Sequence, residues 1–409
     1  MQERVILHSD LNNYYASVEC MIDPTLKDQY VAVCGKREDR HGIVLAKNQK
    51  AKLCGVQTGE PIWQAQQKCP DLVIVPPHFD LYIKYSKCMH ELYYRYTDKI
   101  EPFGLDECWL DVTASGKLFG TGEEIAYAIK ESVKRELGLT VSVGVSFNKI
   151  FAKLGSDMKK PDAVTVITRE NFKRKVWGLP MNDLLGIGRQ TYAKLYKKGL
   201  RTIGDVARCE PKLLRSWLGI NGEKLWVYAN GLDHSRVRPY GDLPAPKSIG
   251  HGITCTADLY DNTEVRKVLS ELAQNVSHRL REGGYSAARL QLGIKDNELH
   301  RQDYQFCLKY PTQSWHEITD KVMQIFLLRY DWRKPVRALS IAALGLEDAA
   351  RPIQTDFFYD MEQHRKIDRV ERSVENIRGR YGRTSIRTAA SLYGLKMPIT
   401  EVEETLIMP

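Results

Sequence analysis

The sequence predicts an α+β protein, and the prediction depends on the order of elements in its two halves. In the first half, short apolar strands such as residues 5–10 and 139–146 accompany amphipathic helices such as residues 123–137. In the second half, the predicted order is βαββαβ, with strands at 252–257, 288–295, 304–309 and 338–346 and helices at 264–280 and 315–326. Because 409 residues exceed one ordinary core, we expect two to four domains.

The composition is that of a soluble globular protein, with 43% apolar and 27% charged residues. A net charge of +9 suits a polyanionic partner, and the alternative is that the basic balance serves solubility. Nine cysteines show no CxxC motif and no zinc-type spacing with histidine, and the first residues lack a signal-peptide core. No apolar run reaches the ~18 residues of a membrane span. We therefore expect a cytoplasmic protein with free thiols, no structural metal site and no membrane segment.

The stretch Leu105–Val112, LDECWLDV, places two carboxylates side by side at Asp106 and Glu107, directly before apolar strand residues. Adjacent carboxylates repel each other, and a shared divalent cation removes that repulsion. The alternative is a solvated hairpin turn, which is where most acidic pairs lie.

A second acid follows another strand-like run. Residues 5–9 are mainly apolar, the run ends at Asp10, and Asn12 or Asn13 is placed to cap the helix that follows. A strand that ends in aspartate beside a helix N-terminus suits a phosphate-and-metal site. The helix N–H groups attract phosphate, and the carboxylate holds Mg²⁺, which takes one or two protein carboxylates plus substrate phosphates.

Three motifs together resemble the Y-family translesion DNA polymerases: SDLNNYYASVE, LDECWLDV and VSVGVSFNKIFAKLGSDMKKP. Their order and spacing agree with the family, and the resemblance extends over nearly the whole chain. It implies a right-hand polymerase with a ferredoxin-like palm, small fingers, a helix-hairpin-helix thumb and an α+β little finger. The implied boundaries are palm 1–22 and 77–175, fingers 23–76, thumb 176–238, linker 239–246, little finger 247–346 and tail 347–409.

The resemblance also implies how the acids are used. Asp10 and Asp106, with the carbonyl group of Leu11, would hold the Mg²⁺ bound to the incoming triphosphate. Glu107, together with both aspartates, would hold a second Mg²⁺ that activates the primer 3′-hydroxyl.

Nucleotide contacts are implied at Tyr15, Tyr14, Asn13, Lys52 and Lys160. Tyr15 matches the steric gate that excludes a 2′-hydroxyl, Lys52 and Lys160 match lysines that reach the triphosphate, and core packing is the alternative for both tyrosines. The chain departs from the commonest family pattern at Asn12, where several members have aspartate, and at Gln49, where many have tyrosine. Both departures occur in the UV-mutagenesis branch.

Other lysines are expected to have no such role. Lys47 and Lys50 are predicted to lie with Lys52 on one helix and to form its solvated face. Lys153 and Lys159 have no counterpart in the family motif, and we expect both to face solvent. The helix at 123–137 has one apolar stripe for packing on a sheet.

The segment 176–239 is basic, with 11 Lys and Arg against 5 Asp and Glu. It contains Gly186-Ile187-Gly188 between two helical patterns, which predicts a helix-hairpin-helix that grips a DNA phosphate through Gly186 and Gly188. The alternative is a plain helix–helix turn. Proline-rich residues 239–246 predict a linker.

Near the C-terminus, PIQTDFFYD precedes a basic helical pattern. Gln354, Phe357 and Phe358 stand like the glutamine and hydrophobic residues of a bacterial sliding-clamp peptide, and exposed aromatics in a polar tail suit a groove-binding motif. The alternative is an aromatic pair that packs on the protein itself.

The predicted function is template-directed, low-fidelity DNA synthesis across lesions by a monomer that uses primer-template DNA, dNTPs and two Mg²⁺ ions. Two alternatives from other classes stay open. One is a DNA- and clamp-binding scaffold with an inactive palm, and the other is a palm enzyme such as a nucleotide cyclase. The acidic residues weigh against the scaffold, and the basic thumb and the tail weigh against the cyclase.

Overall fold

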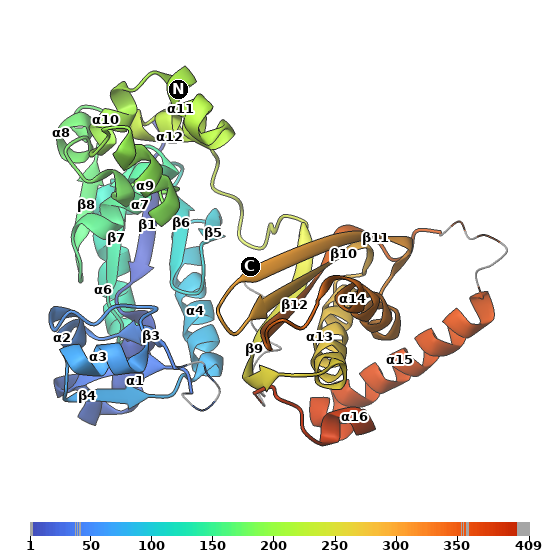
Figure 1. The fold of residues 1–409 in the computed structure, drawn as a ribbon. Helices are drawn as coiled ribbons and strands as arrows, with labels where there is room; N and C mark the ends of the chain where they lie inside the picture. Colours follow the sequence, from blue (N-terminus) through green and yellow to red (C-terminus); the bar gives the residue numbers. More distant parts are fainter. Residues whose placement is uncertain are drawn as a thin grey trace. The chain divides into compact units, whose positions relative to one another are not determined.

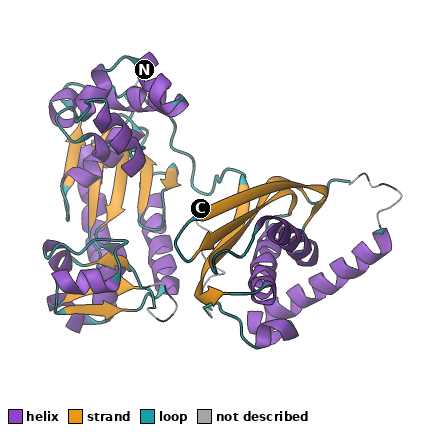
Figure 2. Ribbon diagram, in the orientation of Figure 1, coloured by secondary structure: helices purple, strands orange, loops and turns teal. Residues whose placement is uncertain are grey.

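The computed structural model describes residues 3–36, 38, 40, 42–352, 354, 356 and 360–398. The chain forms two compact units that divide between Leu243 and Pro244, and the short segment from Lys36 to Gly42 belongs to the second unit. Helices and strands mix in both units (Figures 1 and 2), as the α+β prediction requires. Among the described residues, no helix is long and apolar enough to cross a membrane.

The first unit is built on a five-stranded sheet in the order β5-β6-β1-β7-β8. The strands are β1 (Ile6–Leu11), β5 (Ile100–Pro102), β6 (Glu107–Asp111), β7 (Val141–Ser146) and β8 (Val164–Ile167). The central strand β1 is antiparallel to both β6 and β7, whereas β7 and β8 are parallel. This sheet is the predicted palm core.

Helices cover both faces of this sheet, and the alternation of residues along β1 decides which face each side chain meets. Leu7 and Leu11 pack in one core with residues of α4 (Phe79–Tyr94) and α6 (Gly122–Leu137). Ile6 packs on the other face with Ala152 of α7 (Lys149–Met158). Asp10 lies four residues after Ile6 on the same strand, so its side chain points to the same face of the sheet, toward α7.

Local sequence signals fix the helix ends. α6 begins with a capping box in which Thr121 and Glu124 satisfy each other's backbone N–H groups, and it ends at Gly138 in a left-handed conformation. The side chain of Asn148 caps α7. The predicted stripe on α6 is confirmed, since Ile125, Ile129 and Val133 are fully buried.

A second, three-stranded sheet in the order β3-β2-β4 lies between the first and last palm elements in sequence, in the region predicted as fingers. Its elements are η1 (Pro24–Asp28), β2 (Tyr30–Cys34), β3 (Val44–Lys47), α2 (Gln49–Leu53), α3 (Ile62–Lys68) and β4 (Leu72–Val75). One expectation here is wrong: Lys47 ends strand β3 and does not lie on the helix that carries Lys50 and Lys52.

The region predicted as thumb is helical. α8 (Phe172–Val176) precedes this region and ends at its first residue. The elements inside it are η2 (Met181–Asp183), α9 (Arg189–Lys197), α10 (Ile203–Arg208), α11 (Pro211–Leu218) and α12 (Ile220–Ala229). The Gly186-Ile187-Gly188 turn follows the single 3-10 turn η2 and precedes α9, so only one of its two flanking patterns is a full helix. Ile187 is buried and ties this turn to the helical core.

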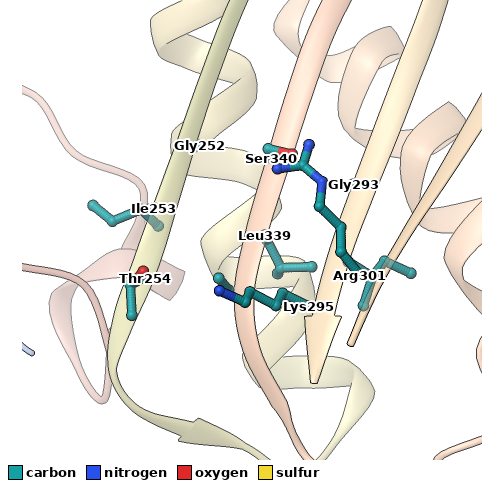
Figure 3. A pocket seen from close by; sticks show the side chains of 10 residues that line it. Gly252, Ile253, Thr254, Gly293, Lys295, Arg301, Leu339 and Ser340 are labelled. Carbon is teal, nitrogen blue, oxygen red and sulfur yellow. The ribbon is translucent and has the colours of Figure 1, made fainter. Parts of the chain in front are cut away.

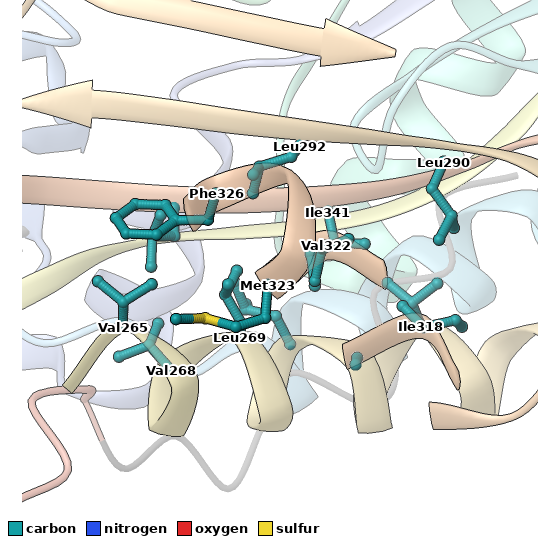
Figure 4. Packing of buried hydrophobic residues seen from close by; sticks show 14 of the residues in the cluster. Val265, Val268, Leu269, Leu290, Leu292, Ile318, Val322, Met323, Phe326 and Ile341 are labelled. Carbon is teal, nitrogen blue, oxygen red and sulfur yellow. The ribbon is translucent and has the colours of Figure 1, made fainter. Parts of the chain in front are cut away.

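The second unit has the predicted βαββαβ order and one antiparallel sheet, β11-β10-β12-β9. Its elements are β9 (Ser248–Leu259), α13 (Asn262–Glu282), β10 (Tyr285–Asp296), β11 (Arg301–Thr312), α14 (Trp315–Arg329) and β12 (Val336–Asp348). Figure 4 shows Leu290, Leu292 and Ile341 of the sheet facing Leu269 of α13 and Phe326 of α14 across one core. Truncation of a buried phenylalanine such as Phe326 to alanine costs about 3–5 kcal/mol.

Beyond β12, the basic pattern forms α15 (Met361–Tyr381), followed by α16 (Ala389–Leu392). α15 is held to the second unit by polar contacts: Glu371 is buried and accepts from Arg281 at 2.7 Å and from the Ser314 hydroxyl at 2.7 Å. All nine cysteines are free thiols, as predicted.

Candidate active site

The pairing of β1 with β6 brings together acids that are about a hundred residues apart in the sequence. In this antiparallel register Asp10 lies directly opposite Glu107. A neighbouring backbone hydrogen bond fixes the position of the third acid, Asp106: the Leu11 N–H donates to the Asp106 carbonyl oxygen at 2.9 Å. Gly104, in the left-handed region with φ 93°, allows the β5–β6 turn that carries Asp106. The sequence-predicted acidic trio therefore lies at one end of the sheet.

Lys153 of α7 and Lys160, just beyond the end of α7, form ion pairs with Asp10 and Glu107. Lys160 Nζ lies 2.7 Å from Asp10 Oδ2, and Lys153 Nζ lies 2.7 Å from Glu107 Oε2 and 3.4 Å from Asp10 Oδ2. Asp157 pairs with both lysines, at 3.2 and 2.9 Å. The expectation that Lys153 faces solvent is wrong, since only 13% of its side chain is exposed. Lys159 is exposed, as predicted.

Lys153 is predicted to lie in solvent, although the sequence holds a signal for its true position. Lys153, Asp157 and Lys160 recur at spacings of four and three, which places the three charges on one side of α7 and its C-terminal extension. Only the packing of α7 on β1 directs that side toward Asp10.

Burial and mutual repulsion set the protonation of the acids. Burial, reinforced by the charge of Glu107, raises the pKa of Asp106 to about 6. Burial also raises the pKa of Asp10, with Glu107 reinforcing and Lys160 opposing the shift. Burial raises the pKa of Glu107 too, but its interactions with His8 and Lys153 outweigh that effect and lower it. A cation near these groups would favour their ionised forms.

His8 lies behind Glu107 and was also overlooked. Its side chain is fully buried on β1, and burial lowers its pKa to about 4, so the imidazole is neutral. Its Nε2 is 3.4 Å from Glu107 Oε2 and makes no hydrogen bond within the described part of the chain, whereas Glu107 Oε2 pairs with Lys153. Its Nδ1 lies 2.9 Å from the Ser156 hydroxyl oxygen.

The two tyrosines at the start of α1 (Tyr14–Ile22) differ in environment. Tyr14 is 3% exposed and its hydroxyl donates to the Tyr82 carbonyl oxygen, which fits the packing alternative. Tyr15 is half-buried; its ring stacks on Tyr82, with 4.2 Å between centroids, and meets the Phe79 ring edge-on. Burial, and after it the charge of Asp106, raises the pKa of Tyr15, as it does for Tyr14.

Asn12 and Asn13 connect these elements. Asn13 precedes α1 in a left-handed conformation with φ 51°, and its side chain makes no capping bond, so the expected side-chain cap is absent. Asn12 is buried; its amide donates to Ser142 at 2.9 Å and its oxygen accepts from the Asp162 N–H at 2.8 Å. Asn12 therefore ties the end of β1 to the loop that carries Lys160.

The remaining predicted residues lie on separate elements. Lys52 is exposed on α2, without an ion pair to any described residue. Gly186 has φ 96°, a conformation that favours glycine, and Gly188 is the N-cap residue of α9. Gln354 is exposed, whereas Phe357 and Phe358 lie outside the described residues.

The sheet face of the second unit opposite α13 and α14 has a shallow hollow of about 280 Å³. Small residues form its floor, because Gly252, Ser340 and Gly293 lie in register across β9, β12 and β10. Lys295 and Arg301 form the neighbouring row, and Figure 3 shows the Arg301 side chain extending over the hollow toward Ser340.

Within the described residues, no three His, Cys, Asp or Glu side chains are arranged as a ready metal-binding set. The chemistry of the site nevertheless fits a divalent ion. Asp10, Asp106 and Glu107 supply hard oxygen ligands, and the pKa values of Asp10 and Asp106 are raised, so a nearby cation would stabilise their ionised forms.

Comparison with known proteins identifies the family. The impB/mucB/samB family model matches residues 9–157, and the model of that family's C-terminal domain matches residues 246–357. A DNA polymerase IV of Acetivibrio thermocellus is 49% identical over 386 residues, which cover 94% of this chain and 96% of the relative. The chain belongs to the Y family of DNA polymerases, of the bacterial DNA polymerase IV type.

Other comparisons agree with this membership. DNA polymerase IV of Pelotomaculum thermopropionicum is 36% identical, with 95% of each chain covered, and DNA polymerase IV 1 of Bacillus subtilis is 33% identical, with 96% of this chain and 94% of the relative covered. A solved Y-family DNA polymerase chimera has the same fold, with a TM-score of 0.74 over 84% of this chain and 99% of its own, at 24% identity. The predicted fold class is confirmed.

Membership in this family settles the class of activity. The protein is a DNA-directed DNA polymerase of the translesion type; it acts on primer-template DNA and dNTPs and uses a divalent metal. The nucleotide cyclase alternative is therefore wrong.

Proposed function

We propose that Asp10, Asp106 and Glu107 hold two Mg²⁺ ions for nucleotidyl transfer from a dNTP to the primer 3′-hydroxyl. Asp10 and Asp106, with the Leu11 carbonyl group, hold the ion that accompanies the triphosphate, and Glu107 with both aspartates holds the second. When bound, such ions lower the pKa of the attacking hydroxyl and offset charge on the transferring phosphoryl group. The observation that carries this assignment is the register of Asp10 opposite Glu107.

Two lysines serve the triphosphate in this proposal. Lys160 lies against Asp10 and Asp157, so its ammonium group is within reach of a phosphate beside the Asp10 carboxylate. Lys52 is exposed and lacks a competing carboxylate partner among the described residues. Asn13 contributes at the start of α1, where backbone N–H groups favour phosphate.

Tyr15 is the steric gate in this proposal, and Tyr14 supports it from the core. The ring of Tyr15 is held by Tyr82 and Phe79, so it resists displacement by a sugar hydroxyl. Exclusion of a 2′-hydroxyl by overlap requires such a braced ring and needs no hydrogen bond from its phenol group.

DNA contacts are assigned to two surfaces. The turn at Gly186 and Gly188 presents backbone N–H groups at the start of α9, in a basic region suited to phosphate contacts. The hollow on the little-finger sheet combines a floor of small residues with Lys295 and Arg301, so a phosphate backbone can approach the sheet closely. Palm, fingers, thumb, linker and little finger keep their predicted boundaries in this proposal.

The tail is assigned a clamp-binding role through Gln354, Phe357 and Phe358. Its support is the motif itself, together with the exposure of Gln354. A monomeric, cytoplasmic enzyme that engages the sliding clamp in this way completes the proposal.

Primer extension tests the metal-site assignment. Asp106→Ala and Glu107→Ala should abolish extension while leaving the dissociation constant for primer-template DNA within a few fold of wild type, because the phosphate-binding surfaces are untouched. Near-wild-type turnover in either variant would refute the metal assignment.

A further inference from the structure

His8 is fixed in place behind Glu107 by the packing of α7 on the sheet. Its ring meets the edge of Trp109, its neighbour across the β1–β6 pair, at 5.2 Å between centroids. α7 approaches the sheet closely at Gly144, where a Cβ atom would lie 1.9 Å from the Ala152 carbonyl oxygen. This close contact brings Ser156 to within 2.9 Å of His8 Nδ1.

The hydrogen-bond count around His8 allows two arrangements. The Ser156 hydroxyl group has one proton to donate. In the structure it donates this proton to the Lys153 carbonyl oxygen, with 2.8 Å between the two oxygen atoms. If Ser156 keeps that bond, a neutral His8 donates its Nδ1–H to Ser156 and turns the Nε2 lone pair toward the Glu107 carboxylate. If Ser156 instead donates to His8 Nδ1, the ring proton moves to Nε2 and points at Glu107.

Only the second arrangement gives the buried Nε2 atom of His8 a hydrogen bond, whereas the first turns its lone pair toward a carboxylate oxygen. His8 Nε2 is buried without a hydrogen bond among the described residues and lies 3.4 Å from Glu107 Oε2, an oxygen that also pairs with Lys153 at 2.7 Å and can accept a second hydrogen bond. A shift of a few tenths of an ångström makes this a hydrogen bond of ordinary length. The Lys153 carbonyl group loses little, because it lies within α7, where backbone hydrogen bonds serve it.

We infer that His8 is a positioning residue for Glu107, donating its Nε2–H to Glu107 Oε2 so that Oε1 stays free for a divalent ion, with Ser156 setting the tautomer. The inference rests on the proposed role of Glu107 as a metal ligand. A neutral imidazole orients the carboxylate without competing with a cation for its charge, which the ammonium group of Lys153 does. Groups that orient ligands in this way typically change metal affinity or activity by about 10- to 100-fold when removed.

Two variants of His8 separate positioning from packing. Glutamine can place an amide N–H near the position of Nε2, whereas asparagine can replace only the contact of Nδ1 with Ser156. His8→Asn should weaken Mn²⁺ binding and lower the single-turnover extension rate by about 10- to 100-fold, and His8→Gln should recover most of both. Thermal unfolding of both variants provides the control for folding. Equal losses in the two variants would show that His8 only fills space.

A spectroscopic measurement on the unmodified protein does not depend on any variant folding. Protonated and unprotonated imidazole nitrogens have distinct ¹⁵N resonances, so ¹⁵N-histidine labelling reports the tautomer of His8 in the Mg²⁺-loaded protein. We expect the Nε2–H tautomer. The Nδ1–H tautomer would overturn the inference.

Glu107→Gln distinguishes failure of this inference from failure of the proposed function. If Glu107→Gln extends primers like wild type, the metal role of Glu107 is wrong and the inference falls with it. If Glu107→Gln is inactive while His8→Asn binds Mn²⁺ and extends primers normally, only the positioning role of His8 is wrong.

Discussion

Replacement of Lys153 by methionine should destabilise the first unit, although a lysine with no motif match would ordinarily be treated as a surface residue. The favourable interactions of Lys153 with Glu107, Asp157 and Asp10 outweigh its burial and raise its pKa from 10.5 to about 12. That difference of about 1.5 pH units corresponds to about 2 kcal/mol of stabilisation. Because the folded-state pKa is raised, the contribution is fully present below pH 10.5 and is lost only as the pH rises toward 12.

Differential scanning calorimetry at neutral pH, without divalent metal, measures this effect. For a unit of this size, about 2 kcal/mol corresponds to a fall of about 4–8 °C in Tm. Lys159→Met is the matched control, because Lys159 lies one residue before Lys160 and is exposed; it should change Tm by no more than about 1–2 °C. Equal Tm values for the two variants would refute the proposed neutralisation of the acids by Lys153. Added Mg²⁺ should stabilise Lys153→Met more than wild type, because the ion replaces the missing charge.

Three further predictions address sugar selection, pH dependence and the tail. Tyr15→Ala should raise relative ribonucleotide incorporation by about two to three orders of magnitude, whereas Tyr15→Phe should change it little, because the phenylalanine ring keeps the contacts with Tyr82 and Phe79; unchanged discrimination in a folded, active alanine variant would place the gate elsewhere. Burial lowers the pKa of His90 from 6.5 to about 4, so the free energy of unfolding should fall as the pH drops below 6.5. In urea unfolding, His90→Gln should lose about 2 kcal/mol less stability than wild type between about pH 7.5 and 5. An equal dependence of the unfolding free energy on pH in both proteins would contradict this. Replacement of both Phe357 and Phe358 by alanine should abolish stimulation by the sliding clamp and spare basal extension, and loss of basal activity would show instead that the aromatics belong to the fold.

The sequence is sufficient to predict that Asp10 and Glu107 lie close together and in what order the helices and strands follow one another. Asp10 and Glu107 each end or begin a recognisable strand, and the motifs that contain them are long enough to pair the two acids from the sequence alone. The helix stripe at Ile125, Ile129 and Val133 depends on local periodicity alone, and its burial is confirmed. Features that depend on periodicity or on a long motif are therefore predictable.

Features that depend on tertiary packing are not predictable in this way. Lys153 and Lys159 have the same local character, yet α7 turns one toward Asp10 and leaves the other in water. His8 looks like part of an apolar run, because its partners Ser156 and Glu107 are distant in sequence. The prediction for Lys47 is wrong because the strand–helix boundary falls at Asn48, whose side chain caps α2.

The number of divalent ions bound at the active site tests the central claim most directly. Mn²⁺ can be counted in a complex of the protein with primer-template DNA and a non-hydrolysable dNTP, for the wild type and for Glu107→Ala. The proposed site predicts two ions per wild-type molecule and one in Glu107→Ala, because Asp10 and Asp106 still hold the ion that accompanies the triphosphate. A single ion in the wild type, or two ions in Glu107→Ala, would contradict the assignment of Asp10, Asp106 and Glu107 as a two-metal site.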